Sequence, residues 1–328
     1  VADTQMYRGN SVIVTVTTTD NRAASSVVCK EGASITYNMD ANVMKQALFD
    51  NVIDWENSAL PAKDTLSIDN FTFEYYGENV LTDNINGGVK QWAPIEGGTV
   101  TLLNYPQMGA ADSQQIRISF KGNADYRPSE AGESTVAVNK AKVSVKVNST
   151  NIYADEQLPA NFVTTNPTDK FDIYTIYAGT TSDVTTSLYL DLPDRYTSNA
   201  ILKILDPVVE AISGKTFTQM LNDGVTVGEL RELFSTQELL DLLDKLNIDT
   251  GTFGQILTVI NKLPSIVDSL RISFGTPNRA GLYTVVAVTD NKNYETGVGM
   301  GFLLVKMRLS GSKLTWNQEI SGKMTVEE

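Results

Sequence analysis

The stretch Lys121-Gly-Asn-Ala-Asp-Tyr-Arg-Pro128 has a counterpart in Asp290-Asn-Lys-Asn-Tyr-Glu-Thr296, and both contain the pattern Asn-x-x-Tyr. An alternating apolar segment precedes each copy, and a Val-rich or Leu-rich segment follows it. The preceding residues are Ile116, Ile118 and Phe120 in the first copy and Tyr283, Val285 and Ala287 in the second. Alternation with a period of two is typical of a half-buried β-strand. The repeated order predicts two copies of one β-module.

Further strands follow the same repeated order. The closing strands are predicted at residues 135–140 and 300–306, and opening strands at Val12, Val14 and Val16 and at Val143, Val145 and Val147. A third pair is predicted at Ile35, Tyr37 and Met39 and at Leu188, Leu190 and Leu192. No Gly-, Pro- or Ser-rich stretch separates Lys140 from Val143, so the joint is expected to be short and semi-rigid. We therefore expect modules at residues 1–140 and 141–328, and one large sandwich is the alternative.

Each module is expected to contain helix between its strands. In the first, residues 40–53 place Met44, Ala47, Leu48 and Val52 on one helical face. In the second, a helical insertion is predicted at about residues 197–270. Its helix starts are indicated by four capping boxes, Thr216 with Gln219, Thr226 with Glu229, Ser235 with Glu238, and Thr252 with Gln255, and by Asp206-Pro207. Gly214 and Pro264 are typical of helix ends.

The predicted helices of the insertion are amphipathic. Their apolar positions are Leu230, Leu233 and Phe234; Leu239, Leu240, Leu243 and Leu246; and Phe253, Ile256, Leu257, Ile260 and Leu263. Such stripes favour a core of the bundle itself. The polar positions, which are expected to face solvent and are the candidate partner-binding residues, are Glu229, Arg231, Glu232, Asp241, Asp244 and Lys245.

Composition excludes several functional classes. The 328 residues carry a formal charge of −13, with no basic run interleaved with aromatics, which disfavours nucleic acid and anionic membranes as partners. Neither an apolar run long enough for direct membrane insertion nor a signal-peptide pattern is present. The chain is therefore interpreted as mature, cytosolic or excised from a larger protein. The absence of His removes the commonest general base and metal ligand.

No motif indicates catalysis. Gly297-Val-Gly-Met-Gly301 precedes a strand rather than a helix, so it lacks the phosphate site of a helix N-terminus. Asp83-Asn-Ile-Asn-Gly-Gly88 lacks the alternating ligands of a calcium loop. The single cysteine, Cys29, is interpreted as a buried free thiol rather than as half of a thioester. We expect no catalytic residues, no metal and no cofactor.

The residues around Tyr283 suggest a family. The stretch Asn278-Arg-Ala-Gly-Leu-Tyr-Thr-Val285 resembles the Gly-x-Tyr-x-Cys corner of immunoglobulin-like domains, with Val285 in place of the cysteine. Together with Asn-x-x-Tyr and Val138-Asn-Lys-Ala-Lys-Val143, it resembles the tandem bacterial immunoglobulin-like repeats of large Gram-positive surface proteins. The resemblance implies a mainly β fold with α insertions, namely two tandem immunoglobulin-like β-sandwich modules, the second carrying a bundle of short helices.

The resemblance also implies a location and a function. The chain is expected at the bacterial cell surface or secreted, as a monomeric fragment of a larger protein. We expect a non-enzymatic module that binds a host extracellular protein or glycoprotein, with immunoglobulin as one candidate, through the helical insertion. Two alternatives remain open. One is a structural spacer, and the other is a carbohydrate-binding module that uses Trp55, Trp92 or Trp316 as a stacking platform.

Overall fold

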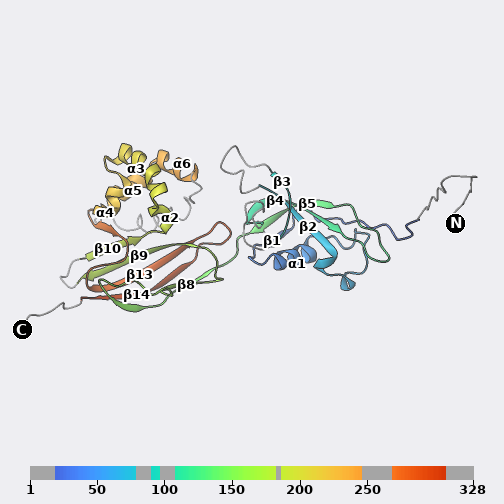
Figure 1. Cartoon of the computed structure of the whole chain (residues 1–328), viewed down its shortest axis with the longest axis horizontal. Helices are drawn as coiled ribbons and strands as arrows, with labels where there is room; N and C mark the ends of the chain where they lie inside the picture. The colour runs from blue at the N-terminus through green and yellow to red at the C-terminus, as the bar shows by residue number, and fades with distance from the viewer. Residues whose placement is uncertain (1–18, 79–89, 97–107, 182–185, 246–267, 308–328) are drawn as a thin grey trace, which may run out of the picture. The chain divides into compact units, whose positions relative to one another are not determined.

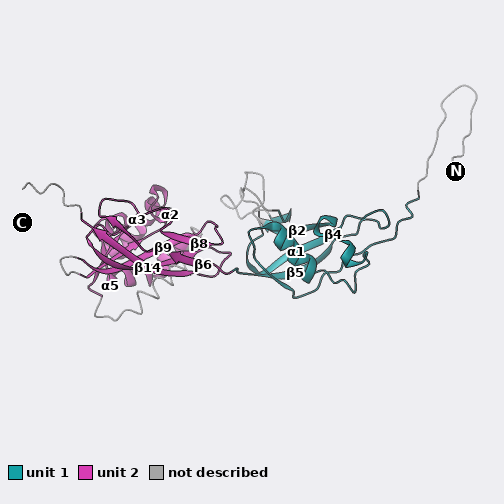
Figure 2. Cartoon of the chain, turned by 90° about the horizontal axis from the view of Figure 1, so that it is seen from below, with its two compact units in different colours: residues 1–141 teal, residues 142–328 magenta. Residues whose placement is uncertain are grey.

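The computed structural model describes residues 19–78, 90–96, 108–181, 186–245 and 268–307. The predicted opening strand at Val12, Val14 and Val16 lies outside these ranges. The chain is mainly β, as predicted, with sheets and few helices. It divides into two compact units, Val1–Ala141 and Lys142–Glu328 (Figure 2).

The first unit contains one sheet of five strands among its described residues. The strands are β1 (Ser34–Thr36), β2 (Phe71–Glu78), β3 (Lys90–Pro94), β4 (Ala111–Phe120) and β5 (Gly132–Asn139), in the order β1-β5-β4-β2-β3. β1 runs parallel to β5, and the other neighbours are antiparallel. The alternating residues Ile116, Ile118 and Phe120 are buried, as the pattern predicted. This sheet therefore supplies one wall of the core.

The described residues of the first unit also form one α-helix and two short 3-10 helices. Helix α1 (Ala41–Asn51) begins at Asp40, whose side chain accepts a hydrogen bond from the Asn42 amide. The predicted face is confirmed at Met44, Leu48 and Val52, which are fully buried, whereas Ala47 is only half-buried. Phe49 of α1 packs edge-on against Phe71 of β2, with ring centroids 5.6 Å apart. The 3-10 helices η1 (Lys63–Thr65) and η2 (Ile68–Asn70) lead into β2.

In the second unit, the residues that the structure describes form a seven-stranded sheet and a two-stranded sheet. The larger sheet has the order β11-β12-β10-β9-β13-β14-β7, and the smaller pairs β6 with β8. The strands are β6 (Ser144–Val147), β7 (Thr150–Tyr153), β8 (Val163–Asn166), β9 (Asp172–Thr181), β10 (Thr186–Asp191), β11 (Val225–Thr226), β12 (Arg271–Phe274), β13 (Gly281–Asp290) and β14 (Val298–Lys306). β7 runs parallel to β14, and β13 lies antiparallel between β9 and β14.

The larger sheet carries a separate core on each face. Consecutive residues of β9 show this division, because Ile176 packs with the helices and Tyr177 packs with the β6–β8 side. Leu188 and Leu190 of β10 also face the helices, whereas Tyr189 faces the β6–β8 side. The helices lie over β9 and β10 (Figure 1).

In the described part of the insertion between β10 and β12, the structure shows five helices. They are α2 (Asp194–Thr197), α3 (Asn199–Ser213), α4 (Phe217–Asp223), α5 (Val227–Phe234) and α6 (Gln237–Lys245). Two of the predicted capping boxes are confirmed, at Thr216 before α4 and at Thr226 before α5. Gly214 ends α3 with φ of 73°, a left-handed conformation that glycine adopts without strain.

Two predicted helix boundaries are wrong. Asp206-Pro207 does not begin a helix, because Pro207 lies inside α3. The carbonyl group that Pro207 leaves without a donor belongs to the exposed Lys203, where water can bond to it, and Leu205 and Val209 stay buried on either side. Asp206 instead accepts hydrogen bonds from the amide and hydroxyl of Thr218 in α4, over 2.8 and 2.7 Å.

The second wrong helix boundary is the capping box predicted at Ser235. Ser235 ends α5, its hydroxyl donates to the Glu232 carbonyl over 2.7 Å, and α6 begins at Gln237. A serine at a helix end bonds to the helix it follows as readily as to the helix it precedes, so the sequence pattern is ambiguous. The predicted box at Thr252, the stop at Pro264 and the stripe from Phe253 to Leu263 lie outside the described residues.

The repeated motif occupies the same position in both sheets. Residues 121–131 join β4 to β5 and residues 291–297 join β13 to β14, which are antiparallel neighbours. In the first copy the Asn123 side chain accepts from the Tyr126 amide over 2.9 Å, and in the second the Tyr294 amide donates to the Asn291 carbonyl over 3.0 Å. The motif is thus a tight asparagine-centred turn.

One part of the predicted repeat is wrong. The strand at Ile35 is predicted to be the counterpart of the strand at Leu188, but β1 lies parallel to the closing strand β5, as β7 does to β14, whereas β10 lies antiparallel to β9. Each unit does contain helix between its strands, with α1 between β1 and β2 and the larger insertion between β10 and β12. Strand partners are set by residues far apart in sequence, which local alternation does not reveal.

Candidate binding surface

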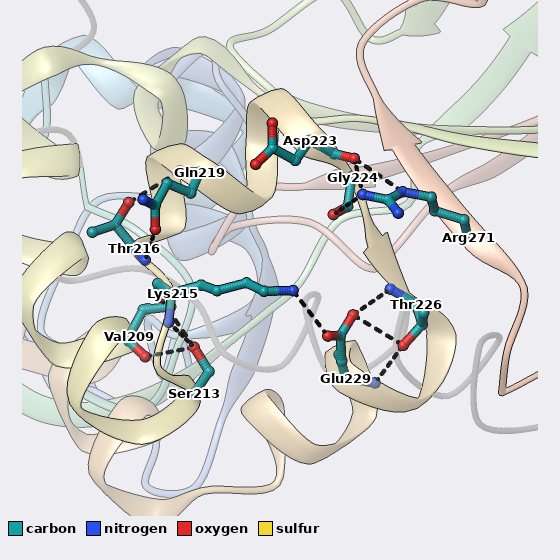
Figure 3. Close-up of polar contacts among 10 residues, drawn as sticks. All are labelled: Val209, Ser213, Lys215, Thr216, Gln219, Asp223, Gly224, Thr226, Glu229 and Arg271. Atoms are coloured by element: carbon teal, nitrogen blue, oxygen red, sulfur yellow. Dashed lines mark hydrogen bonds and ion pairs between the residues drawn. The ribbon is translucent and has the colours of Figure 1, made fainter.

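The predicted polar face of the helices is partly used to hold the fold together. Glu229 closes the cap of α5 by accepting from the Thr226 amide over 2.8 Å and forms an ion pair with Lys215 at 3.2 Å (Figure 3). The pKa of Glu229 is lowered by the hydrogen bond from the Thr226 amide and by the nearby Lys215 ammonium group. Glu229 is therefore a capping residue, and its carboxylate already has partners.

Arg231 is also a structural residue. Its guanidinium forms an ion pair with Asp268, which lies just before β12, and its side chain is only 20% exposed. Close by, Arg271 of β12 donates to the carbonyl oxygen of Asp223 at the end of α4 (Figure 3). These contacts tie α5 to Asp268 and α4 to β12, so a partner would have to compete with the fold for Arg231.

The remaining predicted residues do not form one cluster of contacts. Glu232 and Lys245 are exposed, and Asp241 is exposed while accepting from Gln237 over 2.7 Å. The side chain of Asp244 lies outside the described part of the chain. The polar face therefore offers separate solvated charges rather than a built site.

The apolar stripes of the helices are buried within the second unit. Leu230, Leu233, Phe234, Leu239 and Leu243 all pack into the core shared with β9, β10 and β12, and Leu240 is half-buried. The interpretation that these stripes form the bundle's own core is confirmed for the described helices.

An exposed apolar surface lies instead on the sheet. We call it the β14 strip, and it consists of Val298 (58% exposed), Met300 (68%), Phe302 (56%) and Leu304 (43%) of β14 and Leu282 (58%) of β13. Leu282 and Leu304 are directly opposite each other in the strand pairing. Contiguous exposed apolar side chains are uncommon on monomeric soluble proteins and mark interaction sites.

The strip arises because β14 turns its small residues inward. Gly299 and Gly301 face β6, and a Cβ atom at Gly299 would lie 2.8 Å from the backbone oxygen of Val145. One at Gly301 would lie 2.7 Å from a methyl group of Val147. Such close approach of β6 requires glycine, so within residues 298–302 the large side chains occupy the outward positions.

The corresponding strand of the first unit is built differently. β5 occupies the place of β14, pairing with β4 and with a parallel strand. Its inward residues Ser134, Val136 and Val138 are buried, and its outward residues include the exposed Glu133 and Asn139. An apolar outer face is therefore not a requirement of this strand arrangement. The β14 strip is specific to the second unit.

The tryptophans offer a weaker surface. Trp55 donates its ring N–H to the Phe49 carbonyl over 3.0 Å and packs edge-on against Phe49 and Phe71. Trp92 is half-buried beside Tyr76, and the Arg117 guanidinium lies 4.7 Å from the centre of its ring. Arg117 is fixed there by two hydrogen bonds to Glu74. Trp316 lies outside the described residues.

Cys29 provides a first testable expectation. The Cys29 thiol donates to the Gly132 carbonyl over 3.4 Å, and burial, helped by the negative charge of Glu31, raises its pKa to about 12. Because the thiolate is the reacting form, Ellman's reagent at about pH 8 should react roughly a hundred-fold more slowly with the native protein than with the urea-unfolded protein. Equal rates would contradict this assignment. Adding urea to the same sample should restore fast reaction.

Among the described residues, no group of three metal-ligating side chains is brought together. In the same part of the chain, no helix combines the length and apolar character needed to cross a membrane. No protein-family model matches the chain, and a search of curated proteins finds no match to its sequence.

Proposed function

We propose that the chain is a non-enzymatic extracellular binding module of a bacterial surface protein, and that it recognises a host protein or glycoprotein through the β14 strip. The observation that carries this proposal is the set of exposed side chains at Met300, Phe302 and Leu282. Immunoglobulin remains one candidate partner. The polar back of the helices becomes the secondary candidate surface.

An immunoglobulin-like fold for the second unit is supported by Tyr283. Its hydroxyl donates to the carbonyl of Arg279, four residues earlier, over 2.9 Å. A buried core tyrosine bonded to the upstream backbone is the tyrosine corner of immunoglobulin-like domains. The two-sheet packing and the transfer of the chain from β6 in one sheet to β7 in the other are consistent with a sandwich.

A protein partner is supported by the chemistry of the strip. The five side chains are aliphatic, thioether or aromatic, and none offers the polar groups that would fix a sugar. Phenylalanine and methionine are enriched in the cores of protein interfaces. The half of this sheet face that is formed by β9 and β10 is already covered by apolar helix residues of this chain. The strip therefore continues a face that packs against protein.

A binding experiment tests the proposal. We expect Phe302→Asp to weaken binding of the full chain to purified immunoglobulin or mucin by at least about ten-fold, measured by biolayer interferometry. Asp at this exposed position should leave the melting temperature nearly unchanged. The matched control is Glu232→Lys on α5, which should retain affinity.

Two results would count against the strip. A loss of affinity in Glu232→Lys with none in Phe302→Asp would place the binding surface on the helices. Absence of binding to either host protein by the unmodified chain would favour the spacer function.

A further inference from the structure

The two sides of β14 are paired unequally. On one side β13 pairs with it along the register from Val305 opposite Gly281 to Val298 opposite Val288. On the other side β7 pairs only from Leu303 to Lys306. Among the residues that the structure describes, no strand pairs with residues 298–302 on that side. The edge of the sheet is therefore open beside half of the strip.

The direction of the backbone groups at this edge follows from the hydrogen bonds. The Thr289 amide donates to the Gly297 carbonyl over 3.0 Å, so the backbone N–H and C=O groups of Gly297 point toward β13. Hydrogen-bonded and non-bonded pairs alternate along an antiparallel ladder. The backbone N–H and C=O groups of Gly299 therefore also point toward β13, and those of Val298 and Met300 point away from it. The Phe302 amide agrees with this alternation, because it donates to the Ser149 hydroxyl on the β7 side over 3.0 Å.

Strand β6 does not occupy this edge as a ladder partner. It pairs with β8 in the smaller sheet, from Ser144 opposite Asn166 to Val147 opposite Val163. Its contacts with β14 are made through the inward positions Gly299 and Gly301. β6 therefore approaches β14 from its inward face. Within the described chain, no strand or side chain hydrogen-bonds to the edge-facing N–H and C=O groups of Val298 and Met300.

We propose that an extended segment of the partner protein adds to the sheet as a strand beside residues 298–302 of β14. This inference rests on the proposed function and specifies the form of the partner. The incoming backbone bonds to the N–H and C=O groups of Val298 and Met300, at the usual strand spacing of about 4.8 Å. Alternate apolar side chains of the segment then lie next to Met300 and Phe302 on the outer face.

The binding strand is limited in length by the structure. At one end the Phe302 amide already bonds to Ser149, and β7 occupies the edge from Leu303 onward. The recognised segment is therefore short, with main-chain bonds supplying affinity and the strip selecting apolar residues at every second position. A helix lying on the strip would use the same side chains but none of these backbone groups.

The experiment separates the contribution of the Met300 backbone N–H to binding from that of the Met300 side chain. A random dodecapeptide phage library is selected on the full chain, and the strongest binder is synthesised. We expect apolar residues at alternate positions in the selected peptides. Met300→Pro removes the edge-facing N–H and should weaken the binder at least about ten-fold more than Met300→Ala, which keeps it. Hydrogen exchange of the Met300 amide in the unmodified chain should slow when the peptide binds.

Each contrary outcome overturns a stated part of the inference. Selected peptides without alternation, bound equally by Met300→Pro and Met300→Ala, would indicate a helix or loop on the strip. Self-association of the chain in sedimentation, abolished by Met300→Pro, would make a second copy the occupant. If Phe302→Asp weakens host-protein binding while Met300→Pro matches Met300→Ala, the proposed function stands and strand addition fails. Normal exchange of the Gly301 amide in Met300→Pro confirms that the variant is folded.

Discussion

Replacing Tyr283 with alanine is expected to lower the free energy of unfolding of the second unit by about 4 kcal/mol. The side chain is fully buried, and its ring packs edge-on against Tyr189 with centroids 5.8 Å apart. Truncation leaves a cavity between the two sheets and removes the bond to the Arg279 carbonyl. Urea titration followed by hydrogen exchange of peptides from β13 measures this loss in the full chain.

Two further variants separate the contribution of the Tyr283 hydroxyl to stability from that of its ring and provide a control at the next residue. Tyr283→Phe keeps the ring and loses the hydroxyl bond, so it should cost about 1 kcal/mol. Leu282→Ala changes the neighbouring exposed residue and should cost less than about 0.5 kcal/mol. A loss below about 1 kcal/mol for Tyr283→Ala would show that the tyrosine corner does not anchor this unit.

Gly299→Ala is expected to lower the free energy of unfolding of the same unit by about 2 kcal/mol. The added methyl group would lie 2.8 Å from the backbone oxygen of Val145 and 2.9 Å from one of its methyl groups. A backbone atom cannot rotate away as a side chain does, so β6 must shift. Hydrogen exchange should become faster in β6 and in its partner β8.

The matched control for this substitution is the adjacent outward residue. Met300→Ala shortens a side chain that is 68% exposed and lies on the face of β14 opposite to that of Gly299. It should leave exchange in both strands unchanged. Equal exchange in Gly299→Ala and Met300→Ala would contradict the close approach of β6 to β14.

Local features of the fold were predictable because they depend on neighbouring residues. The caps at Thr216 and Thr226 and the buried face of α1 at Met44 and Leu48 are set within one helical turn. The partners of β1 and β7 were not predictable. Each pairs with a closing strand on the far side of its unit's sequence, and short alternating strands carry no signal that selects one partner over another.

The candidate site was missed for a related reason. Glu229 and Arg231 are charged helix residues, and charge alone does not reveal that one closes a cap and the other binds Asp268. In Val298-Gly-Met-Gly-Phe302, large and small residues alternate, and the ordinary rule places the large ones in the core. The rule fails here because β6 approaches the glycine face. The alternation of Gly with large apolar residues was the available signal.

The parallel pairing of β7 with β14 has a mechanical consequence. β7 follows β6 near the start of the unit, β14 is the last of its described strands, and β7 and β14 point the same way. Tension applied across the unit therefore pulls β7 and β14 in opposite directions along their length. The hydrogen bonds between Thr150–Tyr153 and the facing residues of β14 are loaded in shear and must break together rather than one after another. A strand pair loaded in shear resists stretching more than a hairpin whose hydrogen bonds break one at a time.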